Sequence, residues 1–228
     1  MPSRLEGIRG CVFDAYGTLF DVASACRRHR GTLGEKAAPL AARWRDKQLQ
    51  YTWLRAAQGR HAPFDVVTSD ALSFALRELD IAHEGLAAIL LEEYLRLELF
   101  ADARDALHEI RAAGLRMAIL SNGTAAMLAG LLQNAGLDGA FDAVLSVDEV
   151  GAYKPDRRVY ALAVERLALA PGQICFVSSN AWDAHAASAS GMRVAWCNRA
   201  AQFPEYLPGV PDVQIRTLLE LPAIVVGD

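Results

Sequence analysis

Short apolar segments recur along the chain, and each ends at a polar turn that is followed by a helical pattern. The segments span residues 8–13, 116–120, 143–147, 174–177 and 194–197. Strands that alternate with helices are typical of βαβ units, in which a parallel sheet is covered by helices. The pattern therefore predicts an α/β fold with these five strands in a parallel sheet.

One stretch breaks this alternation, between about residue 20 and residue 98. Only helical patterns occur there, over residues 35–58, 68–79 and 83–97. We expect an all-helical insertion after the first strand, so that residues 1–19 and 99–228 form a core and residues 20–98 form a cap. An open α/β sheet binds ligands at the carboxyl ends of its strands. A cap at that edge would cover the pocket and exclude water.

Composition limits the classes of partner. Of the 228 residues 53 % are hydrophobic, enough for one large domain with an insertion. The net charge is −4, and no long run of either sign occurs, so neither nucleic acid nor a membrane surface is an expected partner. The amino-terminal segment lacks the apolar region of a signal peptide, and no apolar stretch approaches the roughly 20 residues that span a bilayer. We expect a cytoplasmic protein that binds a small molecule.

The four cysteines favour the same location. Cys11, Cys26, Cys175 and Cys197 show no CxxC pair and no zinc-like spacing, and three of them fall in strand-like stretches. We interpret them as reduced core residues.

Polar residues follow the predicted strands at the points where the strands end. They are Asp14, Ser121 with Asn122, Lys154, and the segment from Ser178 to Asp183. The carboxyl ends of parallel strands meet at one edge of a sheet, so these side chains are expected to converge. Two carboxylates, one ammonium group and several hydroxyl or amide groups together form a set suited to catalysis.

Each of these residues also has a structural interpretation when it is taken alone. Asp14 fits a turn-forming residue, and residues 121–124 fit a turn with a helix N-cap. Asn180 and Asp183 fit a capping box. Lys154 fits a solvated side chain before a proline that suits the first turn of a helix. The coincidence of all four groups at one edge favours an active site.

Four short motifs, "DAYGT", "SNG", "YKPD" and "SSNAWD", occur in an order and spacing that resemble the haloacid dehalogenase superfamily. The likeness is strongest to the L-2-haloacid dehalogenases, whose first strand reads close to "FDxYGTLFDV", and it extends to "WRDKQLQYTWLR" in the expected cap. The resemblance implies a Rossmann-like parallel sheet core with a helical cap. It also implies an (S)-2-haloacid dehalogenase, a hydrolase that converts short L-2-haloalkanoic acids to D-2-hydroxy acids.

Most members of this superfamily are phosphatases, which carry a second aspartate where this chain has Tyr16. They usually also carry an acidic residue where this chain has Ser179. Magnesium prefers nearly octahedral oxygen ligation, and only Asp14 and Asp183 remain as charged ligands. Metal-assisted phosphoryl transfer is therefore disfavoured, and we expect neither a metal nor another cofactor. A small-molecule phosphatase and a non-catalytic relative of the same fold remain as alternatives.

The resemblance implies distinct roles for the charged residues. Asp14 is the expected nucleophile that attacks C2 of the substrate, expels halide and forms an ester. Asp183 is the expected residue that orients or activates the hydrolytic water. Lys154 is expected to keep Asp14 ionised, because an opposite charge favours the charged form. The polar residues expected around these carboxylates are Thr18, Ser178 and Asn180.

The anionic substrate needs donors, and the resemblance assigns them to two groups. Ser121 and the backbone N–H groups of Ala15 and Tyr16 are expected to bind the substrate carboxylate, since turn amides are natural anion sites. Arg45 is expected to bind the departing halide, with Asn122 beside it. A weakly hydrated guanidinium suits that ion, and Arg45 interrupts a helix face that otherwise looks buried. The alternative is an arginine that snorkels from a partly exposed face.

Further residues are assigned by the resemblance alone. The expected apolar wall comprises Tyr16, Leu49, Phe64 and Trp182, and Tyr160 is expected to hydrogen-bond near the lysine. Two positions depart from the family pattern: Ala15 replaces a larger residue and would widen the site, and Asp46 would weaken anion binding if it pointed inward. Relatives commonly pair through cap helices, so a homodimer is possible.

Overall fold

A six-stranded parallel sheet forms the centre of the protein, whose computed structural model describes residues 4–226. The strands are ordered β5-β4-β1-β6-β7-β8. Their bounds are β1 Gly10–Phe13, β4 Arg116–Ser121, β5 Ala143–Ser146, β6 Ile174–Ser178, β7 Arg193–Cys197 and β8 Val213–Ile215. The residues of β1 and β6 are fully buried, so these apolar segments form the middle of the core. The chain has an α/β fold with a Rossmann-like parallel sheet, as predicted.

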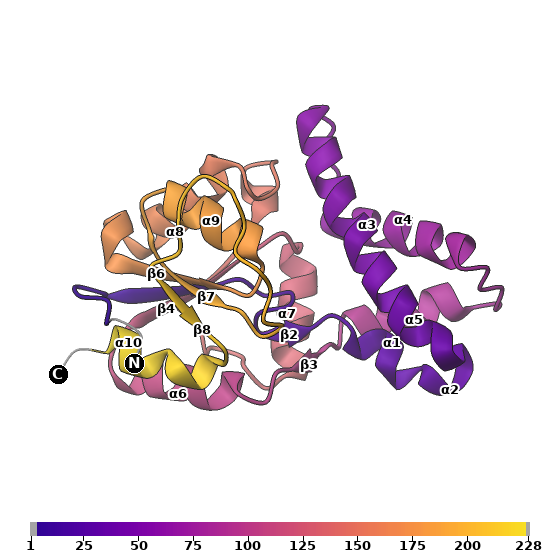
Figure 1. Cartoon of the computed structure of the whole chain (residues 1–228), viewed down its shortest axis with the longest axis horizontal. Coiled ribbons are helices and arrows are strands. Elements are labelled where there is room, and N and C mark those ends of the chain that lie inside the picture. Colours follow the sequence, from indigo (N-terminus) through magenta and orange to yellow (C-terminus); the bar gives the residue numbers. More distant parts are fainter. Residues whose placement is uncertain (1–3, 227–228) are drawn as a thin grey trace.

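Helices cover both faces of this sheet (Figure 1). Two helices, α8 (Arg157–Leu167) and α9 (Ala181–Ala189), lie on one side, and α6 (Ala103–Ala112) and α10 (Pro222–Val225) lie on the other. Helix α7 (Ala125–Asn134) follows β4 and packs beside β5. Short 3-10 turns, η2 (Val147–Glu149), η3 (Pro171–Gln173) and η4 (Leu218–Glu220), complete the connections.

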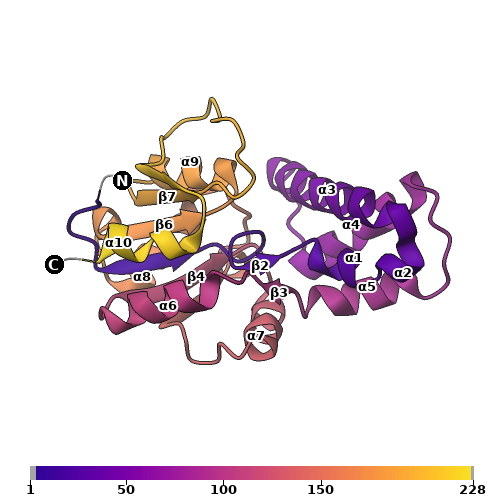
Figure 2. The ribbon, with the colours of Figure 1, turned by 60° about the horizontal axis from the view of Figure 1, so that its bottom comes forward.

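A group of helices formed by residues 24–94 lies apart from the sheet, as two views show (Figures 1 and 2). Its members are α1 (Ser24–Arg28), α2 (Arg30–Leu33), η1 (Gly34–Lys36), α3 (Ala37–Ala57), α4 (Phe64–Glu78) and α5 (Leu86–Tyr94). Two antiparallel strands, β2 (Phe20–Asp21) and β3 (Glu98–Leu99), join the group to the rest of the chain. We refer to this helical group as the cap and to the remainder as the core; the domain boundaries stated above stay a prediction.

Helix α3 packs against α4 along a buried stripe that repeats every four residues. Leu40, Trp44 and Gln48 are buried, and the indole Nε1 of Trp44 donates to the carbonyl of Thr68 at 2.8 Å. Residues at this spacing lie on one face of a helix. The long predicted helix of the cap therefore points one face inward, toward α4.

The sequence pattern missed some elements and misplaced others. Strand β8 has three residues with a polar one in the middle, and β2 and β3 have two residues each, so none carries a readable period. Helix α4 begins at Phe64 instead of residue 68, directly after Pro63. Helix α8 begins at Arg157, because Asp156 caps it, so the proline after Lys154 lies outside the helix.

Two further expectations concern the chain as a whole. Within residues 4–226, no helix combines the length and the apolar character needed to cross a membrane. All four cysteines are buried and carry free thiols, and Cys11 lies beside Cys175 on neighbouring strands. The prediction of reduced core cysteines is confirmed.

Candidate active site

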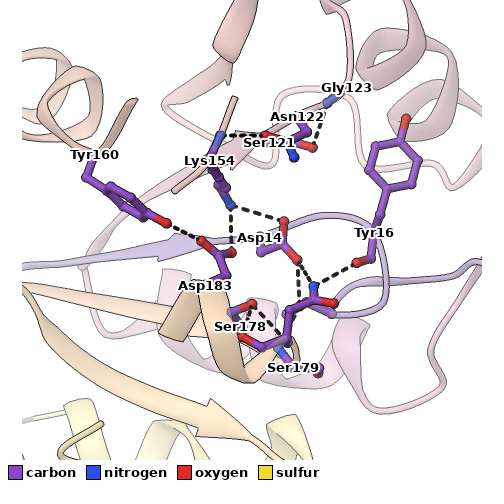
Figure 3. Close-up of polar contacts among 12 residues, drawn as sticks. Asp14, Tyr16, Ser121, Asn122, Gly123, Lys154, Tyr160, Ser178, Ser179 and Asp183 are labelled. Atoms are coloured by element: carbon purple, nitrogen blue, oxygen red, sulfur yellow. Dashed lines mark hydrogen bonds and ion pairs between the residues drawn. The ribbon is translucent and has the colours of Figure 1, made fainter. Parts of the chain in front are cut away.

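The polar residues that follow the strands converge at one edge of the sheet (Figure 3). Asp14 follows β1 in the centre of the sheet, and its neighbours β4 and β6 end in Ser121 and Ser178. Lys154 reaches the same place from the connection between β5 and α8, and Asp183 from the first turn of α9. The predicted convergence of these groups is thus present.

The carboxylate of Asp14 is surrounded by side-chain donors. Lys154 Nζ lies 3.2 Å from Oδ1, while Thr18 Oγ1 donates to Oδ2 at 3.0 Å and Asn180 Nδ2 donates to Oδ2 at 2.8 Å. The side chain is only 8 % exposed. A turn-forming aspartate would use its oxygens on nearby backbone amides, whereas these oxygens accept from the side chains of Thr18, Lys154 and Asn180. The turn interpretation of Asp14 is therefore wrong.

Lys154 bridges the two carboxylates. Its ammonium lies 2.8 Å from Oδ2 of Asp183 as well as 3.2 Å from Asp14, and it is 1 % exposed. Burial by itself lowers the pKa of Lys154, but the charges of Asp14 and Asp183 outweigh it and raise the pKa above its usual value. The backbone N–H of Lys154 donates to Asn122 Oδ1 at 3.1 Å, which anchors the lysine. The solvated-lysine interpretation is wrong.

Asp183 is completely buried and bonded at both oxygens. Tyr160 OH donates to Oδ1 at 2.7 Å, opposite the contact of Lys154 with Oδ2. Burial raises the pKa of Asp183, the nearby charge of Asp14 raises it further, and Lys154 opposes both. Asn180 makes no side-chain capping bond to α9, so the capping-box interpretation of Asn180 and Asp183 is also wrong.

A second layer of hydrogen bonds orients the groups that touch Asp14. The backbone N–H of Ser179 donates to Thr18 Oγ1 at 2.8 Å, which directs the hydroxyl proton of Thr18 toward Asp14. The hydroxyl of Ser178 accepts from the backbone N–H of Asn180 at 3.1 Å. These bonds fix the two donors on Oδ2 of Asp14.

Arg45 brings a second cation from the cap to the core. Its Nη2 donates to the carbonyl of Tyr16 at 3.2 Å and lies 3.5 Å from Asn180 Oδ1, and its Nη1 donates to Gln48 Oε1 at 2.8 Å. A snorkelling arginine would direct its guanidinium into solvent, so that interpretation is wrong. Asp46, the next residue, is exposed and does not point inward.

Aromatic rings form one wall beside this cation. The ring of Tyr16 stacks on Tyr94 with 5.4 Å between the centroids and lies 5.4 Å from the tilted ring of Phe64. The hydroxyl of Tyr16 is buried and has no hydrogen-bond partner among the described residues. A Cβ on Gly123 would lie 2.9 Å from that hydroxyl, so only glycine leaves room for this ring.

Donors for an anion lie at two nearby turns. Ser121 is buried, and its hydroxyl accepts from the backbone N–H of Gly123 at 3.1 Å, so its own proton remains available to donate. Within residues 4–226, no protein group accepts from the backbone N–H groups of Ala15 and Tyr16. These amides adjoin Asp14 and are suited to an anion.

Two residues predicted to line the apolar wall, Trp182 and Leu49, make no described contact with Asp14 or with the ring of Tyr16. Trp182 packs edge-on against Trp53, with 5.4 Å between centroids, and lines a cavity of about 790 Å³ between α3 and α9. Asp14 does not line that cavity. Leu49 is half-buried on α3. The assignment of Trp182 and Leu49 to a substrate pocket stays a prediction.

The donor set does not fit a divalent cation. In residues 4–226, no group of three or more histidine, cysteine or acidic side chains is placed to hold a metal. Tyr16 supplies a buried ring where a second acid would be needed, and the Lys154 ammonium already forms ion pairs with both Asp14 and Asp183. Hard cations prefer several carboxylate oxygens, so these residues suit chemistry that uses the lysine as their cation.

Comparisons with known proteins show the family of this chain. Residues 8–191 match the haloacid dehalogenase-like hydrolase family. The chain belongs to this family. It is 43 % identical to (S)-2-haloacid dehalogenase 1 of Pseudomonas sp. (strain CBS-3), over 97 % of this chain and 98 % of that protein.

Solved structures of the same family superpose closely. A dehalogenase crystal structure has a TM-score of 0.95 at 40 % identity, covering 98 % of this chain and 99 % of the other. The Xanthobacter autotrophicus L-2-haloacid dehalogenase, solved with chloropropionic acid covalently bound, has a TM-score of 0.88 at 37 % identity and covers 95 % and 97 %.

Three buried polar residues next to the site escaped sequence analysis of this hydrolase. They are Gln48, Thr68 and Tyr94, which connect Arg45 to the interior of the cap. One sequence feature could have identified Gln48. It follows Leu40 and Trp44 at four-residue spacing, so it is a polar residue within an otherwise apolar face of the helix.

Proposed function

We propose that this hydrolase is an (S)-2-haloacid dehalogenase, which hydrolyses the carbon–halogen bond of short L-2-haloalkanoic acids and yields D-2-hydroxy acids. One observation supports this most strongly: the Asp14 carboxylate is buried against the Lys154 ammonium at 3.2 Å, while a tyrosine stands where a phosphatase needs an acid. A carboxylate that is positioned beside an ammonium group can act as a nucleophile.

In the first step, one carboxylate oxygen of Asp14 forms a bond to C2 as the bond from C2 to the halogen breaks. The electron pair of that bond leaves with the halide, and the product is an aspartyl ester. Attack from the side opposite the halogen inverts C2, which converts an L-substrate into a D-configured ester. The relative with covalently bound chloropropionic acid supports a covalent step.

In the second step, water attacks the ester carbonyl of Asp14. Asp183 accepts the proton of that water, and its raised pKa makes it a stronger base than an ordinary aspartate. Thr18 and Asn180 donate to Oδ2 of Asp14, where the carbonyl oxygen gains negative charge, and such donors stabilise the tetrahedral species. The bond from the acyl carbon of Asp14 to the substrate oxygen then breaks, and that oxygen takes up the proton held by Asp183, which releases the hydroxy acid and returns Asp183 to its base form.

The substrate carboxylate binds Ser121 and the amides of Ala15 and Tyr16, and the halide leaves toward Arg45, with Asn122 nearby. Phe64 and the ring of Tyr16 contact the short alkyl chain. Lys154 enters the reaction as a cation, because its two carboxylate neighbours raise its pKa. Tyr160 and Ser178 act behind these groups by holding Asp183 and Asn180. A homodimer that pairs through cap helices remains a prediction.

The decisive experiment measures halide release from L-2-chloropropionate in the presence of EDTA. We expect steady turnover of the L-isomer and none of the D-isomer. Asp14→Asn should abolish turnover and leave the unfolding temperature near that of the wild type, because an amide cannot act as the nucleophile. The variant is checked by mass spectrometry for deamidation back to aspartate.

Isotope labelling tests the intermediate itself. A single turnover in heavy-oxygen water should place the label in the Asp14 side chain, because water attacks the aspartyl carbonyl. Label in the hydroxy acid on the first turnover would contradict the mechanism. Metal-stimulated cleavage of p-nitrophenyl phosphate, without halide release, would identify a phosphatase instead, and inactivity in both assays with an intact fold would favour a non-catalytic relative.

A further inference from the structure

A glutamine one turn along α3 holds the guanidinium of Arg45. Arg45 Nη1 donates to Gln48 Oε1 at 2.8 Å, and the Gln48 side chain is fully buried. A buried amide costs free energy unless both of its ends are hydrogen-bonded. Gln48 therefore needs hydrogen-bond partners for both ends of its amide, whereas an apolar residue at the same buried position of α3 would need none.

The network fixes which end of the Gln48 amide faces Arg45. Tyr94 OH donates to the same Oε1 at 3.0 Å, and Nε2 donates to Thr68 Oγ1 at 2.7 Å. The hydroxyl proton of Thr68 is used on the carbonyl of Phe64 at 2.6 Å, so Thr68 Oγ1 can only accept from Gln48. The amide oxygen must therefore point toward the arginine.

The Arg45 guanidinium is consequently hydrogen-bonded through both of its terminal nitrogens. Gln48 fixes Nη1 from the cap side, and the carbonyl of Tyr16 fixes Nη2 from the core side at 3.2 Å. A cation that is positioned before the reaction stabilises developing charge without reorganising. Gln48 is also neutral, so it bonds Arg45 without cancelling the charge that a leaving anion needs.

We propose that Gln48 is a positioning residue for halide departure, acting through Arg45. This inference rests on the dehalogenase activity proposed above. It assigns part of the stabilisation of the departing halide to Gln48, a cap residue that makes no described contact with Asp14. Two features matter: the amide oxygen sets the direction of the guanidinium, and the neutrality of the amide keeps the cation available.

The test compares two leaving groups. The specificity constants kcat/KM for L-2-chloropropionate and L-2-bromopropionate are measured for the wild type, Gln48→Met and Gln48→Glu. Chloride is the poorer leaving group and depends more on the cation. We expect kcat/KM for the chloride substrate to fall by roughly tenfold in both variants and that for the bromide substrate to fall less. The bromide-to-chloride ratio should therefore rise several-fold relative to the wild type.

Matched controls separate positioning from packing. Gln50 lies on the exposed face of α3 and bonds only Lys47 among the described residues, so Gln50→Met and Gln50→Glu should keep the wild-type ratio. Thr68→Val removes the acceptor that fixes the amide and should also raise the ratio. This variant serves as the test if the Gln48 variants fail to fold, as judged by thermal unfolding.

An equal loss for both substrates in the Gln48 variants would show a purely structural role and overturn the inference. An unchanged ratio in folded Thr68→Val would do the same if the Gln48 variants do not fold. Both of these outcomes presuppose that the wild-type enzyme releases halide from the two substrates. A wild-type enzyme that releases neither halide would overturn the proposed function itself, and the two failures are thus distinguishable.

Discussion

Two carboxylates share one ammonium group at this site, and their surroundings differentiate them. Asp14 accepts three side-chain hydrogen bonds, whereas Asp183 is completely buried between Lys154 and Tyr160. Burial raises the pKa of Asp183, which suits this carboxylate to accept a proton. Environments that differ in this way favour separate roles for a nucleophile and a base.

The phenol of Tyr160 should control the acidic limb of the pH–rate profile. Its hydrogen bond lowers the pKa of Asp183, partly opposing the effect of burial. Tyr160→Phe removes that bond, so the pKa of Asp183 rises. Because the base form is required, activity should be lost at a higher pH on acidification than in the wild type.

The measurement is kcat against pH for L-2-chloropropionate. Tyr206→Phe is a suitable control, since Tyr206 is fully exposed and should leave the profile unchanged. An acidic limb of Tyr160→Phe that stays in place or moves to lower pH would remove Asp183 from the role of base.

A further polar cluster joins several elements behind the site. Arg199, just after β7, donates to Asp102 at 2.6 and 2.9 Å and to the carbonyl of Thr18 at 3.1 Å. Asp102 precedes α6 and also accepts from Thr217 Oγ1 at 2.7 Å and from the backbone N–H of Leu218 at 2.8 Å. The turn that carries Thr18 is thereby tied to the chain that returns from the cap.

Asp102→Asn should destabilise the protein and change its response to acid. Burial raises the pKa of Asp102, but Arg199, Thr217 and the amide of Leu218 outweigh it and lower the pKa. A lowered pKa in the folded state gives stability that is present above the unfolded pKa and is lost as the pH falls. The variant should lose about 1–3 kcal/mol of unfolding free energy at neutral pH and should weaken less on acidification.

Urea unfolding at several pH values checks this prediction. Asp105→Asn is the matched control, because Asp105 is exposed on α6. If Asp102→Asn keeps the stability of the wild type at neutral pH, the cluster does not stabilise the fold.

The sequence predicted the main elements because their signals are strong and local. The five predicted strands are buried apolar runs, and parallel strand ends converge by geometry alone, so Asp14 and Ser121 could be placed together. Strand β8 was missed because Val213–Ile215 is too short for a period. Pro155 was wrongly predicted to lie in the first turn of α8, because the helix begins only at Arg157, after its N-cap Asp156.

The whole molecule divides the chemistry between two parts of the chain. The core supplies both carboxylates, the ammonium and the ring of Tyr16, whereas the cap supplies Arg45 and the rings of Phe64 and Tyr94 that pack on Tyr16. Other contacts join the two parts, including the bond from the Tyr153 hydroxyl to the carbonyl of Ala62 and the approach of His61 to Asp148 at 3.3 Å. These two contacts join residues that are 91 and 87 positions apart in the sequence, so no local pattern could predict them.

This division makes Arg45 the strongest test of the cap's part in the reaction. Arg45 is the only cation of the cap with a described hydrogen bond to the turn that follows Asp14, through the carbonyl of Tyr16. In Arg45→Ala, kcat for L-2-chloropropionate should therefore fall by roughly 100-fold or more, which is the usual loss when one charge-stabilising donor is removed. Arg60→Ala, at an exposed position just beyond α3, should leave kcat unchanged. Halide release under saturating substrate measures both. A change below about twofold in Arg45→Ala would mean that the halide leaves without this guanidinium, because a stabilising donor contributes far more than that.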